Sequence, residues 1–302
     1  MWRKQGLVYA TQANYWWSQN YAMLPTIDIM DDILRVYFAS LDEEKIGRIG
    51  FIDLDAHNPK NIVNISEEPV LDIGELGLFD DSGVNPSCLI NIFDCKYLYY
   101  IGWQRTKQTP YMLFTGLAVS KNGSPFKKVK NIPILDRTND EPYSRSAPFV
   151  MKEGNIFKMW YWSCIKWSAK VSNEPHYNNV IKYAVSNNGI DWIPQSEICI
   201  SPNFVEEYSV GRPWVVKDDN LYKMWYSIRS HSEPYKIGYA ISENGVHWER
   251  QDENAGISRS QSGWDSEMIC YPCIIDVHGQ RYLFYNGNRH GSTGFGYAVW
   301  ES

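Results

Sequence analysis

A proline that opens a short apolar strand recurs at a nearly constant interval along the chain. The prolines are separated by 61, 62, 65 and 59 residues, and they stand at Pro25, Pro86, Pro148, Pro213 and Pro272. Because this interval extends over almost all of the 302 residues, it constrains the fold more than any other feature. A repeat of this length indicates one supersecondary unit that is built several times and stacked on its copies.

Further strands follow each proline within the repeat. A second run of aromatic and β-branched residues, as at 157–161 and 222–226, is typical of β-sheet. A third strand ends at a turn that reads Asn-Gly at 188–189, and this pair supplies the positive φ that a tight turn needs. We expect a fourth short strand before the next proline, at 68–72 and at 132–136.

Four strands repeated five times predict an all-β fold, a five-bladed β-propeller. The last copy ends after its third strand, at the end of the sequence. We therefore predict that the N-terminal segment 5–9 supplies the missing strand and closes the ring, which removes exposed sheet edges. Since the repeat fills the chain, residues 1–302 are expected to form a single domain.

Charge and hydropathy exclude several classes of partner. The net charge of −6 gives no basic surface for nucleic acid or for an anionic membrane. No apolar segment is long enough to span a bilayer, and the N-terminus lacks the apolar core of a secretory signal. We expect a cytoplasmic protein with neither nucleic acid nor membrane as a partner; the sequence does not indicate its oligomeric state.

The cysteines, histidines and aromatic residues narrow the chemistry further. Six cysteines are too few for a disulfide scaffold, and Cys88, Cys270 and Cys273 are expected to be buried thiols. No spacing of histidines makes a metal motif, so we expect no metal and no cofactor. The 13 tryptophans and 21 tyrosines suit packed blades, and they also suit a sugar site, because aromatic faces lie well against pyranose rings.

The proline frames and the Asn-Gly-x-x-Trp turns together resemble the five-bladed propellers of the arabinanase, invertase and levansucrase group of glycoside hydrolases. Segments 78–87 and 263–272 are similar to a less characterised branch of glycosidase-like proteins, often found with surface-polysaccharide genes. The resemblance implies three carboxylates beside the proline frames, acting as acid, as base or nucleophile, and as orienting group. The corresponding positions here hold other residues, so the usual triad cannot be carried over; they are Leu24, Ser87, Ser146 and Gly211.

Other carboxylates stand at equivalent places in the loops that enter the predicted inner strands. Asp81 and Glu267 each lie five residues before their proline, and Glu207 lies six before. Because function in a propeller gathers at the mouth formed by these loops, we predict an acid/base pair drawn from these three residues. The alternative is that they cap loops or pair with neighbouring cations.

Two arginines at the same mouth favour an anionic substrate. Arg145 and Arg212 lie three residues and one residue before their prolines, and a guanidinium is a planar fork suited to carboxylate or phosphate. They favour a sugar acid, a sugar phosphate or a nucleotide-linked sugar as ligand; alternatively, they neutralise Glu207 and its neighbours. Asn85 and Tyr271, directly before their prolines, are expected to point towards the axis and bind the substrate.

The remaining binding candidates are histidines, an acid and a tryptophan. We expect the histidines to lie at one level of the rim, in loops between second and third strands, with Arg229 nearby. Core packing and turn capping are the alternatives for the tryptophan and the acid. These candidates are His176, His231, His290, Asp265 and Trp17.

The sequence therefore predicts a carbohydrate-active, glycoside hydrolase-like enzyme. We expect it to act at or near the anomeric centre of an anionic or activated sugar through carboxylate acid/base chemistry. Two alternatives stay open. One is a non-hydrolytic module for glycan binding or polysaccharide assembly, and the other is a synthetic enzyme that remodels a nucleotide-linked sugar.

Overall fold

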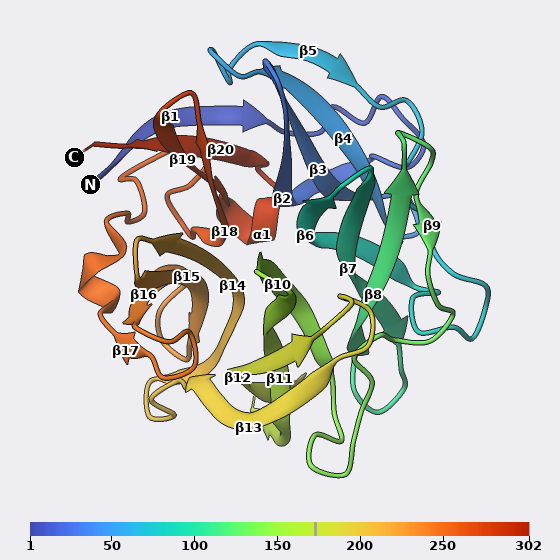
Figure 1. The fold of residues 1–302 in the computed structure, drawn as a ribbon, viewed down its shortest axis with the longest axis vertical. Helices are drawn as coiled ribbons and strands as arrows, with labels where there is room; N and C mark the ends of the chain where they lie inside the picture. Colours follow the sequence, from blue (N-terminus) through green and yellow to red (C-terminus); the bar gives the residue numbers. More distant parts are fainter. Residues whose placement is uncertain (172–173, 302) are drawn as a thin grey trace.

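The protein is built almost entirely of β-strands (Figure 1). The computed structural model describes residues 1–171 and 174–301. Helix is confined in these residues to the short α1 (Asn288–Gly291) and to one 3-10 turn, η1 (Asp252–Ala255). No helix within the described ranges is long and apolar enough to cross a membrane. The all-β prediction is confirmed.

The strands form antiparallel groups that follow one another around a common centre (Figure 1). In chain order, the first two groups contain β2 (Asn20–Met30), β3 (Ile33–Leu41), β4 (Gly47–Asp55), β5 (Ile62–Ile65), then β6 (Gly83–Ile92), β7 (Cys95–Arg105), β8 (Tyr111–Lys121) and β9 (Lys127–Lys128). The next two contain β10 (Arg145–Glu153), β11 (Ile156–Val171), β12 (Glu174–Ser186), β13 (Ile193–Ile200), then β14 (Glu207–Asp218), β15 (Leu221–Ser230), β16 (Lys236–Ser242) and β17 (Glu249–Arg250). The fifth contains β18 (Cys270–Val277), β19 (Gln280–Asn286), β20 (Phe295–Trp300) and β1 (Trp2–Tyr9).

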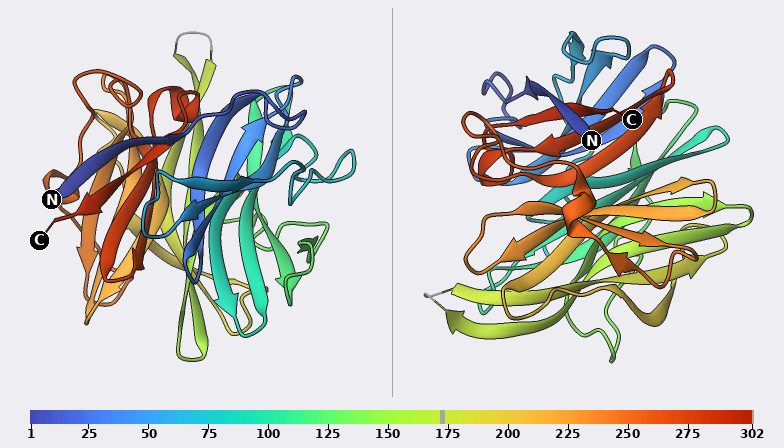
Figure 2. Two further views of the ribbon diagram at one scale, coloured as in Figure 1. Left: turned by 90° about the horizontal axis from the view of Figure 1, so that it is seen from above. Right: turned by 90° about the vertical axis from the view of Figure 1, so that its left-hand side faces the viewer.

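Strand β1 joins the two ends of the chain. It pairs antiparallel with β20, in a register that runs from Trp2 opposite Trp300 to Tyr9 opposite Phe295. Beside this ladder, the backbone N–H of Glu301 donates to the carbonyl of Met1 at 2.9 Å. Figure 2 shows the termini next to each other at the edge of the molecule. The first four groups form one 16-stranded sheet, and the fifth forms a separate sheet in the order β1-β20-β19-β18.

The predicted positions of the fourth strands are wrong. The structure places the fourth strands earlier, at β5 and β9, and not at 68–72 and 132–136. In the first of these segments, Leu71 forms only an isolated bridge with Ile49, and the second segment has one equivalent bridge. Each predicted segment contains a proline, which has no N–H to donate to a ladder, so neither extends into a regular strand.

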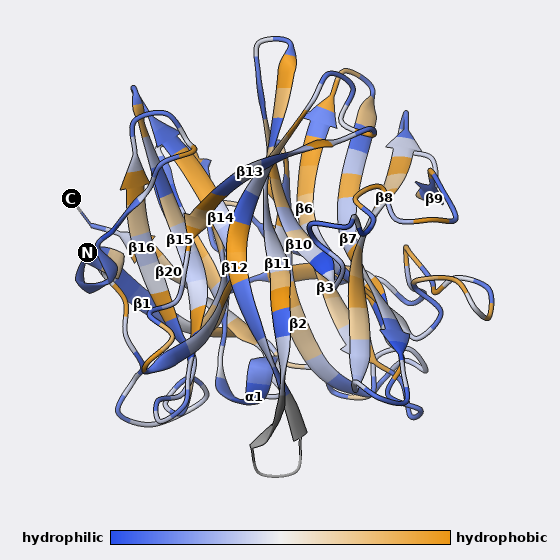
Figure 3. Cartoon of the chain, turned by 90° about the horizontal axis from the view of Figure 1, so that it is seen from below, coloured by the Kyte–Doolittle hydropathy of each residue, from blue (hydrophilic) through white to orange (hydrophobic). Residues whose placement is uncertain are grey.

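Apolar side chains fill the space between neighbouring groups. Figure 3 shows hydrophobic residues concentrated along the strands, whereas the loops are mostly hydrophilic. Trp214 is typical: its ring centroid lies 4.9 Å from that of Phe149 in the preceding group, and its indole N–H donates to the carbonyl of Ile274 in the next. Cys88 and Cys273 are buried free thiols, as predicted. The aromatic residues thus fix each group against both neighbours.

Candidate functional site

A cavity of about 480 Å³ opens where the inner strands begin. All five strand groups contribute to its lining, and each contributes the residue directly before its proline. These five residues are Leu24, Asn85, Ala147, Arg212 and Tyr271. The proline repeat therefore determines which residues line the cavity as well as the order of the strands.

The backbone before the proline has an unusual conformation in four of the five frames. The φ angles are +57° at Leu24, +48° at Ala147, +52° at Arg212 and +58° at Tyr271, which is the left-handed region. In every frame the antiparallel register also shifts at this point. A bulge of this kind redirects a side chain, and strained backbone of this kind gathers at functional sites.

Arg212 is a buried cation whose donors are only partly used. The residue is 3% exposed, and its Nη2 donates to Oγ1 of Thr26 at 3.1 Å. Its Nε and Nη1 have no hydrogen-bond partner among the described residues, and no carboxylate among them pairs with it. Burial lowers the pKa of this guanidinium. The positive charge of Arg212 is thus not neutralised by the described part of the chain. This is unusual, because a buried charge is normally paired.

A second arginine stands in the same cavity. The guanidinium carbon of Arg229 lies 4.7 Å from the ring centroid of Tyr177 and 4.6 Å from that of Tyr235. Nearby, burial and then the charge of Arg229 lower the pKa of His290 to about 4, so this imidazole is neutral at pH 7. No Asp or Glu is among the described residues that line the cavity. Its charge is therefore positive, although the chain as a whole is acidic.

Aromatic rings form much of the remaining wall. They come from all five groups and are Tyr21, Trp103, Tyr111, Trp162, Tyr177, Tyr208, Tyr235 and Tyr271. Rings of this kind offer flat apolar faces together with hydroxyl or indole donors, which suits a ligand with apolar faces and polar edges.

A neighbouring cavity of about 390 Å³ continues the first one over the second strand group. The two cavities share six lining residues, Asn85 and Trp103 among them. The second cavity adds Lys45 and Arg105, which are both exposed, and again no acid among the described lining residues. Together the two cavities make a continuous cleft with basic groups at both ends.

The predicted catalytic carboxylates lie outside the residues that line this cleft. Both oxygens of Glu207 accept hydrogen bonds from Arg250, at 2.8 and 2.9 Å. Asp81 accepts from the backbone N–H of Gly77 at 2.9 Å and from its neighbour Ser82 at 2.7 Å. These are the ion pairing and loop capping named above as the alternative.

Glu267 is more accessible. Its side chain is 63% exposed and lies 4.0 Å from Nε of Arg289. Its backbone N–H donates to the Asn288 side chain at 2.7 Å, in the segment that also carries His290. The catalytic role of Asp81, Glu207 and Glu267 remains a prediction.

Arg145 and Asp265, predicted to bind substrate, belong to a repeated arrangement inside the strand groups. In each case a carboxylate in the loop before the inner strand accepts from a tyrosine of the second strand, 20 residues later in the chain, and pairs with a cation. Glu141 accepts from Tyr161 at 3.0 Å and lies 3.3 Å from Arg145, which also donates to the carbonyl of Asp136. We call these arrangements carboxylate–tyrosine clusters.

The same arrangement fixes the N-terminal strand. Asp265 accepts from the Tyr285 hydroxyl at 2.9 Å and from Nζ of Lys4 at 2.6 Å. Asp80 and Tyr100 form the corresponding pair in the second group, at 2.8 Å. The spacing of 20 residues between acid and tyrosine recurs in the second, third and fifth groups; in the fourth, Tyr226 lies 20 residues after Glu206 but donates to Asp252 instead.

The histidines and the tryptophan are placed differently from one another. His176 and His290 line the cavity, whereas His231 lies outside it, with its ring centroid 5.2 Å from that of Tyr208. His176 lies within β12 and not in a loop, because β11 and β12 form a longer hairpin than predicted. Trp17 is fully buried, donates to the carbonyl of Glu67, and lies outside the cavity lining.

Comparison with known proteins shows a close relative. No family model matches the chain. The uncharacterized protein Rv1502 of Mycobacterium tuberculosis H37Rv is 36% identical over 302 residues, and the match covers 100% of this chain and 99% of that protein. The uncharacterized protein MT1551 of the CDC 1551 strain matches to the same extent.

Solved structures show the same fold at low sequence identity. A glycoside hydrolase matches with a TM-score of 0.77 and 17% identity, covering 98% of this chain and 90% of its own. A putative glycosidase from Bacteroides thetaiotaomicron matches with a TM-score of 0.75 and 13% identity, covering 99% and 96%. A structure from the GH130 family, described as mannoside phosphorylases and as glycoside hydrolases of β-1,2-mannosidic linkages, gives 0.74 and 13%, covering 100% and 94%. The chain thus shares the fold of glycoside hydrolase-like propeller proteins, as the sequence resemblance predicted.

Proposed function

Because this chain belongs to the family of the Mycobacterium tuberculosis protein Rv1502 and shares the fold of glycoside hydrolase-like proteins, we propose that it is a carbohydrate-active protein that binds an anionic sugar. The ligand lies in the cavity at the start of the inner strands, with its anionic group on Arg212 and Arg229. A sugar phosphate, a sugar acid and a nucleotide-linked sugar share the chemistry that this cavity recognises.

The unpartnered donors of Arg212 carry this proposal. Nε and Nη1 of Arg212, which face different sides of the guanidinium, both lack a hydrogen-bond partner among the described residues. A buried cation in this state is costly unless an anion neutralises it, and the oxygens of a carboxylate or phosphate can accept charge-assisted hydrogen bonds from these free donors. Arg229 stands against two tyrosine rings and supplies a second set of donors. No carboxylate among the described residues forms an ion pair with it, so its charge is available to a ligand.

The aromatic wall supports a sugar as the body of the ligand. Tyrosine and tryptophan faces accommodate the apolar faces of pyranose rings, and the neutral imidazole of His290 offers both a donor and an acceptor to hydroxyl groups. The basic Lys45 and Arg105 in the adjoining cavity favour a ligand that extends along the cleft, such as a nucleotide-linked sugar.

We further propose that the five strand groups are the blades of a five-bladed β-propeller and that β1 closes the ring. The antiparallel pairing of β1 with β20 supports closure. So does the ion pair of Lys4 with Asp265, since it joins the first strand to the loop that precedes β18.

A thermal-shift screen tests the anion site. Sugar phosphates, sugar acids and nucleotide-linked sugars are compared with their neutral parent sugars, because a ligand that binds the folded state raises the melting temperature by mass action. We expect shifts from the anionic members, abolished in Arg229→Met and retained in Arg137→Met, which changes an exposed arginine outside the cavity. Equal shifts from charged and neutral sugars would contradict the proposal.

Carboxylate catalysis is the second part of the proposed function and is tested separately. Asp81→Asn, Glu207→Gln and Glu267→Gln are each assayed for turnover of any ligand that the screen identifies, and for its affinity. A carboxylate that serves as acid or base loses turnover by about 10²- to 10⁴-fold with little change in affinity. If all three variants turn over the ligand normally, the catalytic assignment to these acids fails. If the wild type binds the ligand without turnover, the chain is a glycan-binding or polysaccharide-assembly module.

A further inference from the structure

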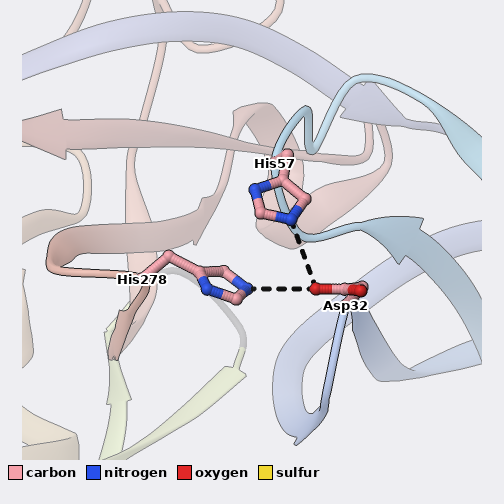
Figure 4. A group of neighbouring side chains, drawn as sticks. All are labelled: Asp32, His57 and His278. Atoms are coloured by element: carbon pink, nitrogen blue, oxygen red, sulfur yellow. Dashed lines mark hydrogen bonds and ion pairs between the residues drawn. The ribbon is translucent and has the colours of Figure 1, made fainter.

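A cluster of metal-ligating side chains lies at the opposite end of the inner strands from the cavity. Asp32 stands in the turn between β2 and β3, and His57 in the loop after β4. His278 stands in the turn between β18 and β19, so the cluster combines residues of the first and the fifth strand group (Figure 4). None of these residues lines the cleft described above.

The donor atoms of the three residues lie within 4.8 Å of one another. Nε2 of His57 lies 3.2 Å from Oδ1 of Asp32, and Nε2 of His278 lies 3.6 Å from the same oxygen (Figure 4). In a tetrahedral site with metal–ligand distances of about 2.0–2.1 Å, neighbouring donor atoms are roughly 3.3 Å apart. The two separations from Asp32 Oδ1 lie within about 0.3 Å of this value. The two imidazole donors lie no more than 4.8 Å apart, and rotation of these exposed side chains brings both onto one ion.

The backbone around the cluster holds these side chains in place. The N–H of Ala56 donates to the carbonyl of Asp32 at 2.9 Å, which fixes the loop after β4 against the β2–β3 turn. The Asp55 carboxylate accepts from the N–H of His57 at 2.8 Å. The rings of His57 and His278 stack with their centroids 4.5 Å apart and their planes 23° apart. The geometry is thus formed by neighbouring contacts and does not need a rearrangement of the chain.

The turn at His278 gives a further indication. This residue has a φ of +49° and is followed by Gly279 at +74°, so the turn needs two residues in the left-handed region. Gly, Asn and Asp are the residues that favour such turns. Histidine also tolerates the left-handed region, and this backbone turns the imidazole of His278 towards His57 and Asp32.

We propose that Asp32, His57 and His278 form a binding site for a divalent first-row transition ion such as Zn²⁺. Two imidazoles and one carboxylate are ligands that suit Zn²⁺, Ni²⁺ and Cu²⁺, and three protein ligands leave a position for water. The bound ion joins the first strand group to the fifth. These two groups are the first and last copies of the repeat along the chain. The site is independent of the proposed sugar site.

Calorimetric titration of the metal-free protein with Zn²⁺ tests the site. We expect one ion per chain, and a loss of affinity of at least tenfold in both His278→Asn and Asp32→Asn. Asparagine tolerates the left-handed conformation, so His278→Asn preserves the turn. The matched control is His247→Asn, which changes an exposed histidine of another turn and should bind as the wild type does.

Thermal unfolding gives a second readout of the same proposal. At a free Zn²⁺ concentration of 100 times Kd, binding favours the folded state about a hundredfold, and the melting temperature rises accordingly. His278→Asn should melt as the wild type does without metal and should show no rise with it. Zn²⁺ binding that is equally tight in His278→Asn and wild type, or a rise in melting temperature that survives this substitution, would overturn the proposal.

Discussion

Replacing Arg212 by methionine is expected to stabilise the ligand-free protein while it removes anion binding. Nε and Nη1 are two buried donors without a partner among the described residues, and each such donor costs about 1–3 kcal/mol. Their removal thus saves about 2–6 kcal/mol, against about 1 kcal/mol for the lost hydrogen bond to Thr26. Methionine is flexible enough to fill the space of the arginine stem. The net gain in the free energy of unfolding is about 1–5 kcal/mol.

Arg145→Met is the matched comparison, because Arg145 is equally buried but paired. Its guanidinium lies 3.3 Å from Glu141 and donates to the hydroxyl of Tyr161. Removing Arg145 deletes its buried ion pair and hydrogen bonds, although Nζ of Lys182 still lies 3.3 Å from the same Glu141 oxygen, and the loss costs about 1.5–3 kcal/mol. The same substitution at two buried arginines is therefore predicted to change stability in opposite directions.

Urea unfolding followed by tryptophan fluorescence measures both changes, and calorimetry with a sugar phosphate measures the affinity of Arg212→Met. Two charge-assisted hydrogen bonds are worth about 3–6 kcal/mol, so the affinity should fall by about 10²- to 10⁴-fold. If Arg212→Met is destabilised as strongly as Arg145→Met and still binds the anion with wild-type affinity, Arg212 has a structural role and the reasoning fails.

Two further predictions concern the N-terminal strand and the pH dependence of binding. Asp265→Asn removes the carboxylate that accepts hydrogen bonds from both Lys4 and Tyr285, and it should lower the free energy of unfolding by about 3 kcal/mol. An unchanged urea midpoint would show that this carboxylate–tyrosine cluster does not hold β1. His290, with a pKa of about 4 beside Arg229, should take up a proton when an anion binds, since the anion favours the charged imidazole. The affinity for a sugar acid should therefore rise as the pH falls from about 6 towards 4, and calorimetry should find no such rise in His290→Gln; the same rise in both proteins would contradict this role.

The order of the strands could be predicted from the sequence because prolines, aromatic runs and Asn-Gly turns determine the backbone conformation of the residues next to them. The inner, second and third strands of the repeat lie where these signals place them. The fourth strands of the first two repeats were predicted too late, because short apolar runs around Pro69 and Pro133 look like strands, but the proline in each has no N–H to continue a ladder.

The chemistry of individual side chains was harder to predict, since it depends on which neighbour each side chain meets. Arg145 and Arg212 stand three residues and one residue before their prolines and were both predicted to bind the substrate. Glu141 pairs with Arg145, whereas the left-handed backbone at Arg212 places that residue in the cavity wall. His57 and His278 come together from distant parts of the chain, so no local spacing could reveal their contact with an acid.

The most direct test of the account is a calorimetric comparison of one sugar phosphate with its unphosphorylated parent sugar on the wild-type protein. The account predicts that the phosphate strengthens binding by about 10²-fold or more, because it satisfies the free donors of Arg212. It also predicts that this preference is lost in Arg212→Met. Equal affinity for the two sugars, or tighter binding of the neutral one, would contradict the claim that the cavity recognises an anionic sugar.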